Sequence, residues 1–393
     1  KQMKMKSIFL SMLAIAALAS CSKEENVSPP ELQGEQVTVK LTIGGNPLTS
    51  KVGGAANNTG DIDVKNLSIF GVNATGTVVS KMYSASLNDE GSSKKSVEFK
   101  TSTQVTSVYV VANTATDLTT ASGALNVTTL KGLKNATASL LTGSDPSQIE
   151  GRVLMAGENA SVTITPGTTN NIAVNLKYIG AKIILRSVSR GADSKGAYNT
   201  DFNLQHVYLN NVNTKAYFFA EGGSHLAAIQ TTGSERLNIT KELATGMPSG
   251  GSGTIITDFA QVFSPAAFAL NAKVDDVGYW FVFENNEALT GTPTTLLIHY
   301  GWKENKTDQD FKDMYFPVRF AAGDAFADGT IQPGYAYAVD ITLNGDFRSL
   351  DDSGSGGGGG TPDPDVPVVP TDVTVTVTPV AWNTDVSVSK PFN

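Results

Sequence analysis

DVTVTVTPVAWNTDVSVSKPFN, residues 372–393, ends the chain and contains one of its clearest strand patterns. Strict alternation of apolar and polar residues predicts a β-strand with one apolar face. A glycine-rich tract (354–360) and a proline-rich stretch (362–370) separate this segment from everything before it, and such sequences form flexible and extended linkers. The apolar positions of the segment are Val373, Val375, Val377, Val380, Trp382, Val386 and Val388.

The other end of the chain has the pattern of an export signal. Three lysines, an apolar run from residue 8 to 19 and small residues at its boundary predict a secretory signal peptide that is too short to span a membrane. Leu18 and the small residues before Cys21 resemble a lipobox, which predicts removal of residues 1–20 and lipidation of Cys21. Cys21 is the only cysteine, so no internal disulfide is possible.

Length and charge narrow the function classes. The mature part of a 393-residue chain is long enough for about two domains. The net charge is −8, and no basic patch with interleaved aromatic residues occurs, so nucleic acid is not an expected partner. No stretch after residue 20 is apolar enough to span a bilayer, so we expect membrane attachment only through lipid on the precursor.

The part of the chain between residues 36 and 345 is predicted to be all-β. Many short β-branched runs bounded by turn residues favour sandwiches over a parallel α/β fold, and only 128–141 suggests a short helix. Strands are expected at 36–43, 64–72, 105–113, 160–166, 171–179, 181–188, 205–212, 215–220, 278–285, 294–302, 313–320 and 335–345. The predicted division is a signal peptide (1–20), a propeptide with the first strand (21–51), two sandwiches (52–170 and 171–348), a linker (349–371) and a terminal strand (372–393).

No catalytic set, metal site or cofactor site is predicted. The histidines, at 206, 225 and 299, share no metal-ligand motif, and no nucleophile elbow or phosphate-binding loop occurs. Asp308, Asp310 and Asp313 lack the glycine and glutamate of a calcium loop. Trp280 and Trp302 could stack on a sugar, but aromatic residues in alternating strands more often belong to the core.

A strand placed beyond a linker can fold back into its own sheet, stay disordered, or add to the sheet of another molecule. Addition satisfies its backbone and buries alternate side chains, but it needs a vacant groove. The first strand could leave such a groove, because the Gly- and Asn-rich stretch after it contains a single basic residue, Lys51, at a site suited to proteolysis. Cutting there would remove Cys21 together with the apolar face of that strand, which comprises Val37, Val39, Leu41 and Ile43.

Together these features resemble the fimbrillins, the type V pilins of Bacteroidales. The resemblance covers essentially the whole chain and includes the lipobox, the acidic Ser22-Lys23-Glu24-Glu25 segment typical of surface-exposed lipoproteins, and the terminal strand with Trp382. Further similar stretches are LSIFGVN (67–73), SVYVVANT (107–114), RVLMAG (152–157), KYIGAKIILRSV (177–188), YWFVFEN (279–285), YFPVRF (315–320) and YAVDITLNG (337–345).

The resemblance implies two tandem transthyretin-like β-sandwich domains with a C-terminal donor-strand appendix. It also implies export as an outer membrane lipoprotein, proteolytic removal of the first strand, and polymerisation into an extracellular fimbria with accessory tip and anchor pilins. Family members processed by an arginine-specific protease carry arginine in the loop, so with Lys51 the protease must accept lysine or the cut lies elsewhere.

The leading hypothesis is therefore a pilus shaft subunit that assembles with copies of itself and serves adhesion. The intact terminal strand disfavours a tip subunit, which has no need to donate one. A cell-anchored fimbrial subunit and a glycan-binding surface lipoprotein are the alternatives, and a hydrolase has the least support because no acid–base pair is present.

Overall fold

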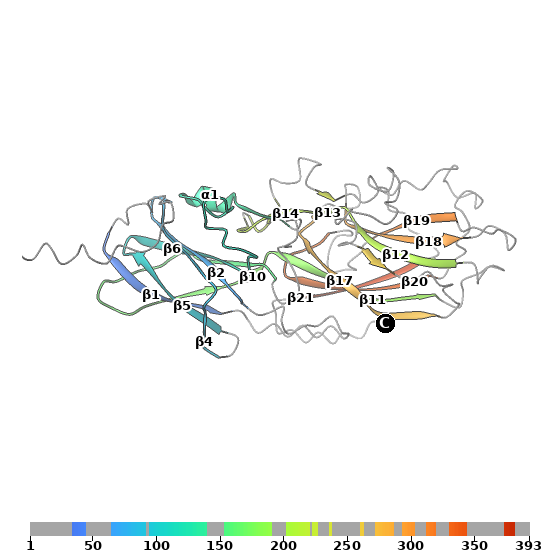
Figure 1. Ribbon diagram of the computed structural model, residues 1–393, viewed down its shortest axis with the longest axis horizontal. Helices are drawn as coiled ribbons and strands as arrows, with labels where there is room; N and C mark the ends of the chain where they lie inside the picture. Colours follow the sequence, from blue (N-terminus) through green and yellow to red (C-terminus); the bar gives the residue numbers. More distant parts are fainter. Residues whose placement is uncertain are drawn as a thin grey trace, which may run out of the picture.

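The computed structural model describes residues 34–44, 64–91, 94–139, 153–190, 202–220, 222–226, 236–237, 260–262, 272–286, 293–302, 312–319, 330–343 and 373–381. Within these ranges nearly all regular structure is β, with one short helix, α1 (Leu130–Lys134). The predicted all-β class is confirmed. Two groups of strands follow one another along the long axis of the molecule (Figure 1).

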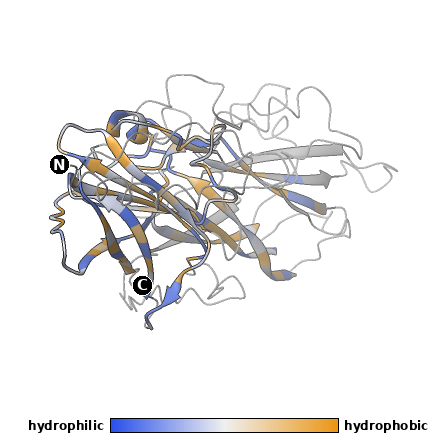
Figure 2. Cartoon of the chain, turned by 60° about the vertical axis from the view of Figure 1, so that its left-hand side comes forward, coloured by the Kyte–Doolittle hydropathy of each residue, from blue (hydrophilic) through white to orange (hydrophobic). Residues whose placement is uncertain are grey.

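The first group forms a sandwich of two sheets with the strand orders β4-β5-β1-β9 and β10-β8-β6-β2-β3. Apolar side chains such as Val39, Phe99, Ile69 and Val110, each at most 2% exposed, fill the space between the sheets. Apolar and polar stretches alternate along these strands (Figure 2). The strands are β1 (Gln36–Gly44), β2 (Leu67–Asn73), β3 (Val78–Ser84), β4 (Asn88–Asp89), β5 (Lys94–Ser102), β6 (Val105–Ala112), β8 (Met155–Asn159), β9 (Asn170–Asn175) and β10 (Lys177–Tyr178).

The second group forms another sandwich, with the orders β17-β11-β20-β21 and β16-β12-β18-β19. Its strands are β11 (Gly180–Arg190), β12 (Phe202–Asn210), β16 (Ala260–Val262), β17 (Lys273–Phe283), β18 (Thr295–Trp302), β19 (Lys312–Arg319), β20 (Tyr335–Leu343) and β21 (Val373–Ala381). Two small sheets pair β13 (Val212–Asn213) with β15 (Arg236–Leu237) and β7 (Thr137–Ser139) with β14 (Lys215–Tyr217).

The two sandwiches repeat one topology. In each, the first strand lies between an antiparallel neighbour (β5 or β17) and a parallel neighbour from near the end of the unit (β9 or β20). Strands β1, β2, β3, β5, β6, β8 and β9 pair as β11, β12, β16, β17, β18, β19 and β20 do. Strand β21 has no counterpart in the first unit and extends the second.

The pairing changes from one sandwich to the other between Tyr178 and Gly180. Strand β10 still pairs with β8, and β11 begins at Gly180. The sequence places the boundary near residue 170, at the turn TPGTTNN, and this turn leads into β9 of the first sandwich.

The two sandwiches are packed against each other. The Tyr109 and Phe219 rings meet edge to face at 5.3 Å, and the Phe218 N–H donates to the carbonyl of Ala136 at 3.1 Å. Phe281, from the second sandwich, is 7% exposed and belongs to the apolar cluster of the first. Apolar contact and strand pairing (β7 with β14) therefore both join the two units.

The helix is shorter than the sequence predicts. It begins after Thr129, whose hydroxyl accepts the N–H of Gly132 at 3.1 Å, and it ends at Lys134 rather than near residue 141. The chain then pairs as β7 with β14, because Thr137 to Ser139 find strand partners in the second sandwich. Pairing with a distant segment thus replaces the last turns of the predicted helix.

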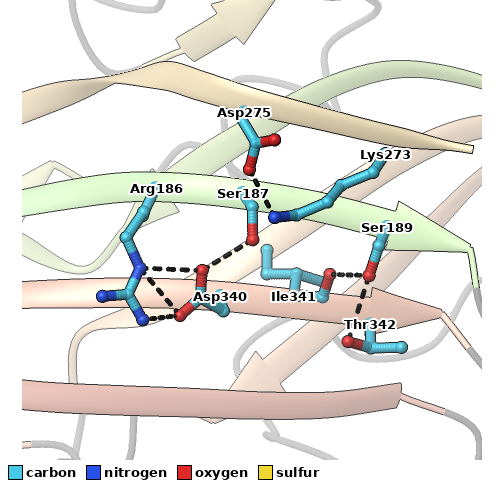
Figure 3. Close-up of polar contacts among 8 residues, drawn as sticks. All are labelled: Arg186, Ser187, Ser189, Lys273, Asp275, Asp340, Ile341 and Thr342. Carbon is cyan, nitrogen blue, oxygen red and sulfur yellow. Dashed lines mark hydrogen bonds and ion pairs between the residues drawn. The ribbon is translucent and has the colours of Figure 1, made fainter. Parts of the chain in front are cut away.

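An ion pair links neighbouring strands on the polar face of the second sandwich (Figure 3). The Arg186 guanidinium donates from Nε to both oxygens of Asp340 at 3.0 Å, and the Ser187 hydroxyl donates to Asp340 at 2.6 Å. Burial acts to raise the pKa of Asp340, but the hydrogen bonds from Arg186 and Ser187 outweigh it and hold this pKa below its ordinary value. The charged carboxylate therefore stabilises the fold.

Replacing Asp340 with Asn is expected to destabilise the second sandwich at pH 7 by about 1 kcal/mol, since the pair is partly exposed and its strength is discounted for solvent screening. A carboxyl whose pKa is lowered by folding contributes stability above its unfolded pKa of about 3.9 and loses it as the pH falls through the folded pKa. Chemical denaturation between about pH 7 and 2 should show a smaller acid loss in Asp340→Asn than in the wild type.

The matched control is Asp275→Asn. Asp275 pairs with Lys273 at 2.6 Å, but both side chains are more than half exposed, so its loss should cost no more than about 0.5 kcal/mol. Equal effects of the two substitutions would show that the Arg186 pair does not stabilise the fold.

Candidate strand-exchange site

Strand β1 occupies an interior position in the first sheet. It pairs antiparallel with β5 along its whole length, and parallel with β9 from Val39 to Gly44. The alternation predicted from the sequence is present, since Val39, Leu41 and Ile43 are 0–1% exposed and Val37 is partly buried. An N-terminal strand thus completes both the sheet and the core of the first sandwich.

The contacts of β1 are too strong for the strand to leave unaided. Burying Val39, Leu41 and Ile43 stabilises the strand by about 5–9 kcal/mol in gross terms, and its backbone hydrogen bonds to two neighbours add to that. Removal would expose the apolar side chains opposite it and leave a slot one strand wide between β5 and β9. Only another strand with alternating apolar residues would fill such a slot.

Strand β21 pairs with β20 of its own chain. The pairing is antiparallel and runs over nine residues, from Val373 opposite Leu343 to Ala381 opposite Tyr335. Val375 and Val377 lie opposite Ile341 and Val339, which are fully buried. Of the three arrangements open to a strand beyond a linker, the single chain adopts the first, in which the strand joins its own sheet.

The register of β21 also explains its alternation. Thr374 and Thr376 lie opposite Thr342 and Asp340, on the polar face that carries the Arg186 ion pair. Directly opposite residues in an antiparallel pair share a face of the sheet. By register, Val373, Val375 and Val377 therefore share a face with Leu343, Ile341 and Val339, and the threonines share the opposite face, whereas Val380, after Pro379, lies in register with the threonine positions.

Several predicted residues lie outside the described part of the chain. These are Cys21, Lys51, Trp382, Val386 and Val388; Val380 falls within β21, opposite Ala336. No helix in the described segments is long and apolar enough to cross a membrane.

Two histidines that are far apart in the sequence lie side by side in the sheet. His206 and His299 are cross-strand neighbours, with their Nδ1 atoms 2.9 Å apart and their ring planes within 5°. The two Nδ1 atoms are therefore used in a hydrogen bond to each other. Burial lowers the pKa of the third, His225, whose Nδ1 lies 2.8 Å from the carbonyl oxygen of Tyr217. Among the described residues no cluster of three metal-ligating side chains occurs.

The aromatic residues do not form a sugar platform where their side chains are described. Trp280, Phe281 and Phe283 are 1–7% exposed and belong to the apolar clusters. Trp302 ends β18 and Asp313 lies in β19, but their side chains are outside the described set, as are residues 308 and 310 altogether. The feature best suited to a function is thus the pair of terminal strands, β1 and β21.

Solved structures of similar fold come from Bacteroides and Porphyromonas species. A cell adhesion protein from Bacteroides eggerthii DSM 20697 is 27% identical, with a TM-score of 0.63 over 91% of this chain and 98% of that one. A fimbrilin from Porphyromonas gingivalis W83 is 17% identical, with a TM-score of 0.54 over 88% of this chain and 97% of that one. The second likeness shows the fold alone. No curated protein sequence matches the chain significantly.

Two family models match successive parts of the chain. Residues 36–216 match the major fimbrial subunit protein (FimA), and residues 244–382 match the C-terminal domain of FimA-like major fimbrial subunit proteins. The second match extends through β21. Both models describe structural subunits of cell-surface fimbriae and not enzymes. With family matches over most of its length and a fold similar to that of the Bacteroides protein over 91% of the chain, the chain belongs to the FimA-like family of fimbrial subunits.

Proposed function

We propose that this fimbrial subunit builds the shaft of the fimbria, that it is exported as an outer membrane lipoprotein, and that it polymerises by donor-strand exchange. The observation that carries the proposal is the position of β1. It is an interior strand of the first sheet, yet it joins the body only through the stretch 45–63, which contains Lys51. One cut in that stretch separates a core strand from its domain.

The proposed processing is cleavage after Lys51 by a trypsin-like protease. It cuts the covalent link that ties Cys21, with its lipid, and β1 to the body, so that an incoming strand can displace β1 and take the slot between β5 and β9. An apolar site is then lined by side chains that are at most 7% exposed in the intact subunit, those of Val97, Phe99, Ile172 and Val174. Such a surface is costly in water, so the slot favours an incoming strand.

The proposed occupant is β21 of a second copy of the chain. It is nine residues long, as β1 is, and its valines alternate as the apolar residues of β1 do. Among the described strands of its own subunit it lies at the end of the strand order and has one sheet neighbour, β20. Transfer to the slot would give it two neighbours, so its backbone would gain hydrogen bonds.

Repetition of this transfer gives a homopolymer on the cell surface. Accessory tip and anchor pilins would end the fibre at either side, and adhesion would be its role. A subunit that kept Cys21 and β1 would instead be a cell-bound anchor, so the fate of Lys51 separates the two roles.

Cys21 is expected to be absent from assembled fibres. Mass spectrometry of sheared fibres should find a mature N-terminus at Val52, and lipidated Cys21 only in the precursor. In Lys51→Ala, β1 should stay in place and the chain should remain a folded monomer. Fibres of normal length from Lys51→Ala cells, or the Cys21 peptide throughout the shaft, would contradict the proposed processing.

Removing residues 372–393 is expected to leave both sandwiches folded, because the pairing of β11 with β17 and β20 does not require β21. The melting temperature should fall modestly, since β20 becomes an edge strand. Filaments should not form from the truncated subunit alone. Mixed with wild type, it should shorten filaments, because it can accept a strand but cannot donate one. Electron microscopy measures both effects, and normal filaments from the truncated subunit alone would refute donor-strand exchange.

Single substitutions in β21 are expected to follow its alternation. Val375→Asp places a carboxylate on the core face and should weaken donation by on the order of 100-fold, measured as filament yield against subunit concentration. Thr374→Asp is the matched control, because it adds the same charge on the polar face opposite Thr342. Thr376 is a poorer control since it lies opposite Asp340, where a second carboxylate would be repelled. Equal losses from the two variants would show that the predicted faces do not direct donation.

A further inference from the structure

Strand β9 is the weaker wall of the slot that holds β1. Within the described strands β1 is its only sheet partner, whereas β5 also pairs with β4. Because β5 and β9 run antiparallel to each other, they could pair directly if β1 left and β9 moved inward by about one strand spacing, ~4.8 Å. A slot that closed in this way could not accept a strand.

The structure shows what resists that movement. On the side of β9 away from β1, the Asn159 side chain reaches across from β8 in the opposite sheet, and its amide donates to the carbonyl oxygen of Ala173 at 3.0 Å. The other end of the same amide accepts the N–H of Ser161 at 3.2 Å, which fixes its orientation. Asn159 therefore ties the middle of β9 to a sheet that does not depend on β1.

Close backbone contact adds to this tie. A Cβ at Gly157 would lie 2.1 Å from the carbonyl oxygen of Asn175, so glycine is what lets β8 approach the end of β9 this closely. Immediately after β9 the chain crosses to the other sheet, where β10 pairs with β8 through Lys177 and Tyr178. The C-terminal end of β9 is thus fixed from β8.

The start of β9 is fixed as well. The Asn170 side chain closes the preceding turn, accepting the N–H of Thr165 at 2.9 Å and donating to the carbonyls of Thr165 and Thr168 at 2.9 and 3.2 Å. Upstream of that turn, the N–H of Val162 donates to Thr106 in β6 at 2.8 Å. None of these contacts involves β1.

The opposite wall has a comparable tie. The hydroxyls of Thr101 on β5 and Ser80 on β3 are 2.6 Å apart and buried, which joins β5 to the other sheet. Both walls of the slot are therefore attached to the sheet that remains when β1 is removed.

We infer that Asn159 and Gly157 are positioning residues that hold β9 in place after β1 departs, so that the incoming strand meets a preformed slot. The inference rests on the proposed function, since it assigns a role within donor-strand exchange. If this inference is right, the contacts of Asn159 are not needed to hold β9 while β1 is present, because backbone pairing with β1 then holds it. They become decisive once β1 has gone.

The test uses the full chain with a cleavage site for a specific protease introduced into the stretch 45–63. After cleavage, the β1 segment is removed by gel filtration in moderate urea, and the remaining chain is returned to buffer. Two measurements follow: uptake of a labelled synthetic peptide of residues 372–393, and hydrogen exchange of the amides of β9. The uncleaved chain is melted in parallel.

Asn159→Ala is expected to weaken peptide uptake by the cleaved chain about three- to tenfold, the value of one hydrogen bond. Amides 170–175 should exchange faster than in the cleaved wild type, while the melting of the uncleaved chain stays unchanged. Asn171→Ala is the matched control, because Asn171 lies on the same strand with its side chain exposed. Gly157→Ala should have a larger effect, and if it fails to fold, Asn159→Ala decides alone.

The outcomes separate the inference from the function on which it rests. If the cleaved wild type takes up no peptide, donor-strand exchange fails, and the exchange rates of β9 still decide whether Asn159 holds the wall. If the wild type takes up peptide and Asn159→Ala matches Asn171→Ala in uptake and exchange, the positioning role is wrong. A lower melting temperature for uncleaved Asn159→Ala would show a general structural role and overturn it too.

Discussion

The first sandwich depends on the pairing of its first strand, β1, with β9, a strand from near its end. Strand β1 lies between β5 and β9, and its apolar side chains close the core from the middle of the sheet rather than from its edge. An edge strand can be lost with little disturbance of its sheet. Loss of an interior strand leaves two walls and an apolar floor, which is the shape of an acceptor. The same residues that stabilise the unprocessed subunit would therefore bind the strand that replaces β1.

The second sandwich has the same topology, but its first strand cannot be removed and replaced in the same way. Strand β11 holds the place of β1, yet it is covalently continuous with β10 on one side and leads toward β12 on the other, so a single cut cannot release it. Strands β9 and β20, which hold corresponding places in the two sandwiches, also differ in what contacts their outer edges. The edge of β9 is met by the Asn159 side chain, and the edge of β20 by the backbone of β21. In the proposed assembly the first unit would therefore act as the acceptor and the second would supply the donor strand.

The local sequence pattern correctly predicted strands in which apolar and polar residues alternate throughout. It failed where pairing with a distant segment determines whether a strand forms. The burial of Val39, Leu41 and Ile43 follows directly from their spacing. Strand β5 was not predicted, because lysines surround its inward Val97 and Phe99 and Thr101 occupies a core position. The alternating stretch 160–166 was predicted as a strand but forms none, since Val162 makes only a single backbone bond to Thr106.

The candidate site could be predicted only in part, because local pattern indicates strands but not their distant partners. Alternation identified both terminal strands and their apolar faces, but it holds no information on partners. The parallel pairing of β1 with β9, the docking of β21 on β20 and the contact of His206 with His299 all join residues far apart in the chain. The positions of Cys21 and Lys51 in the fold lie outside the described residues.

The packing between the sandwiches has a mechanical consequence. Tyr109 and Phe219 meet within an apolar layer that contains side chains of both units, and β7 and β14 form a two-stranded seam across it. Tension applied to the two ends of the chain must pass through this joint. A joint held by a packed layer resists bending and shear, whereas a bare linker would swing freely. In a rod built from such subunits, this joint would make the two sandwiches move as one segment, and the rod would bend at its connections between subunits.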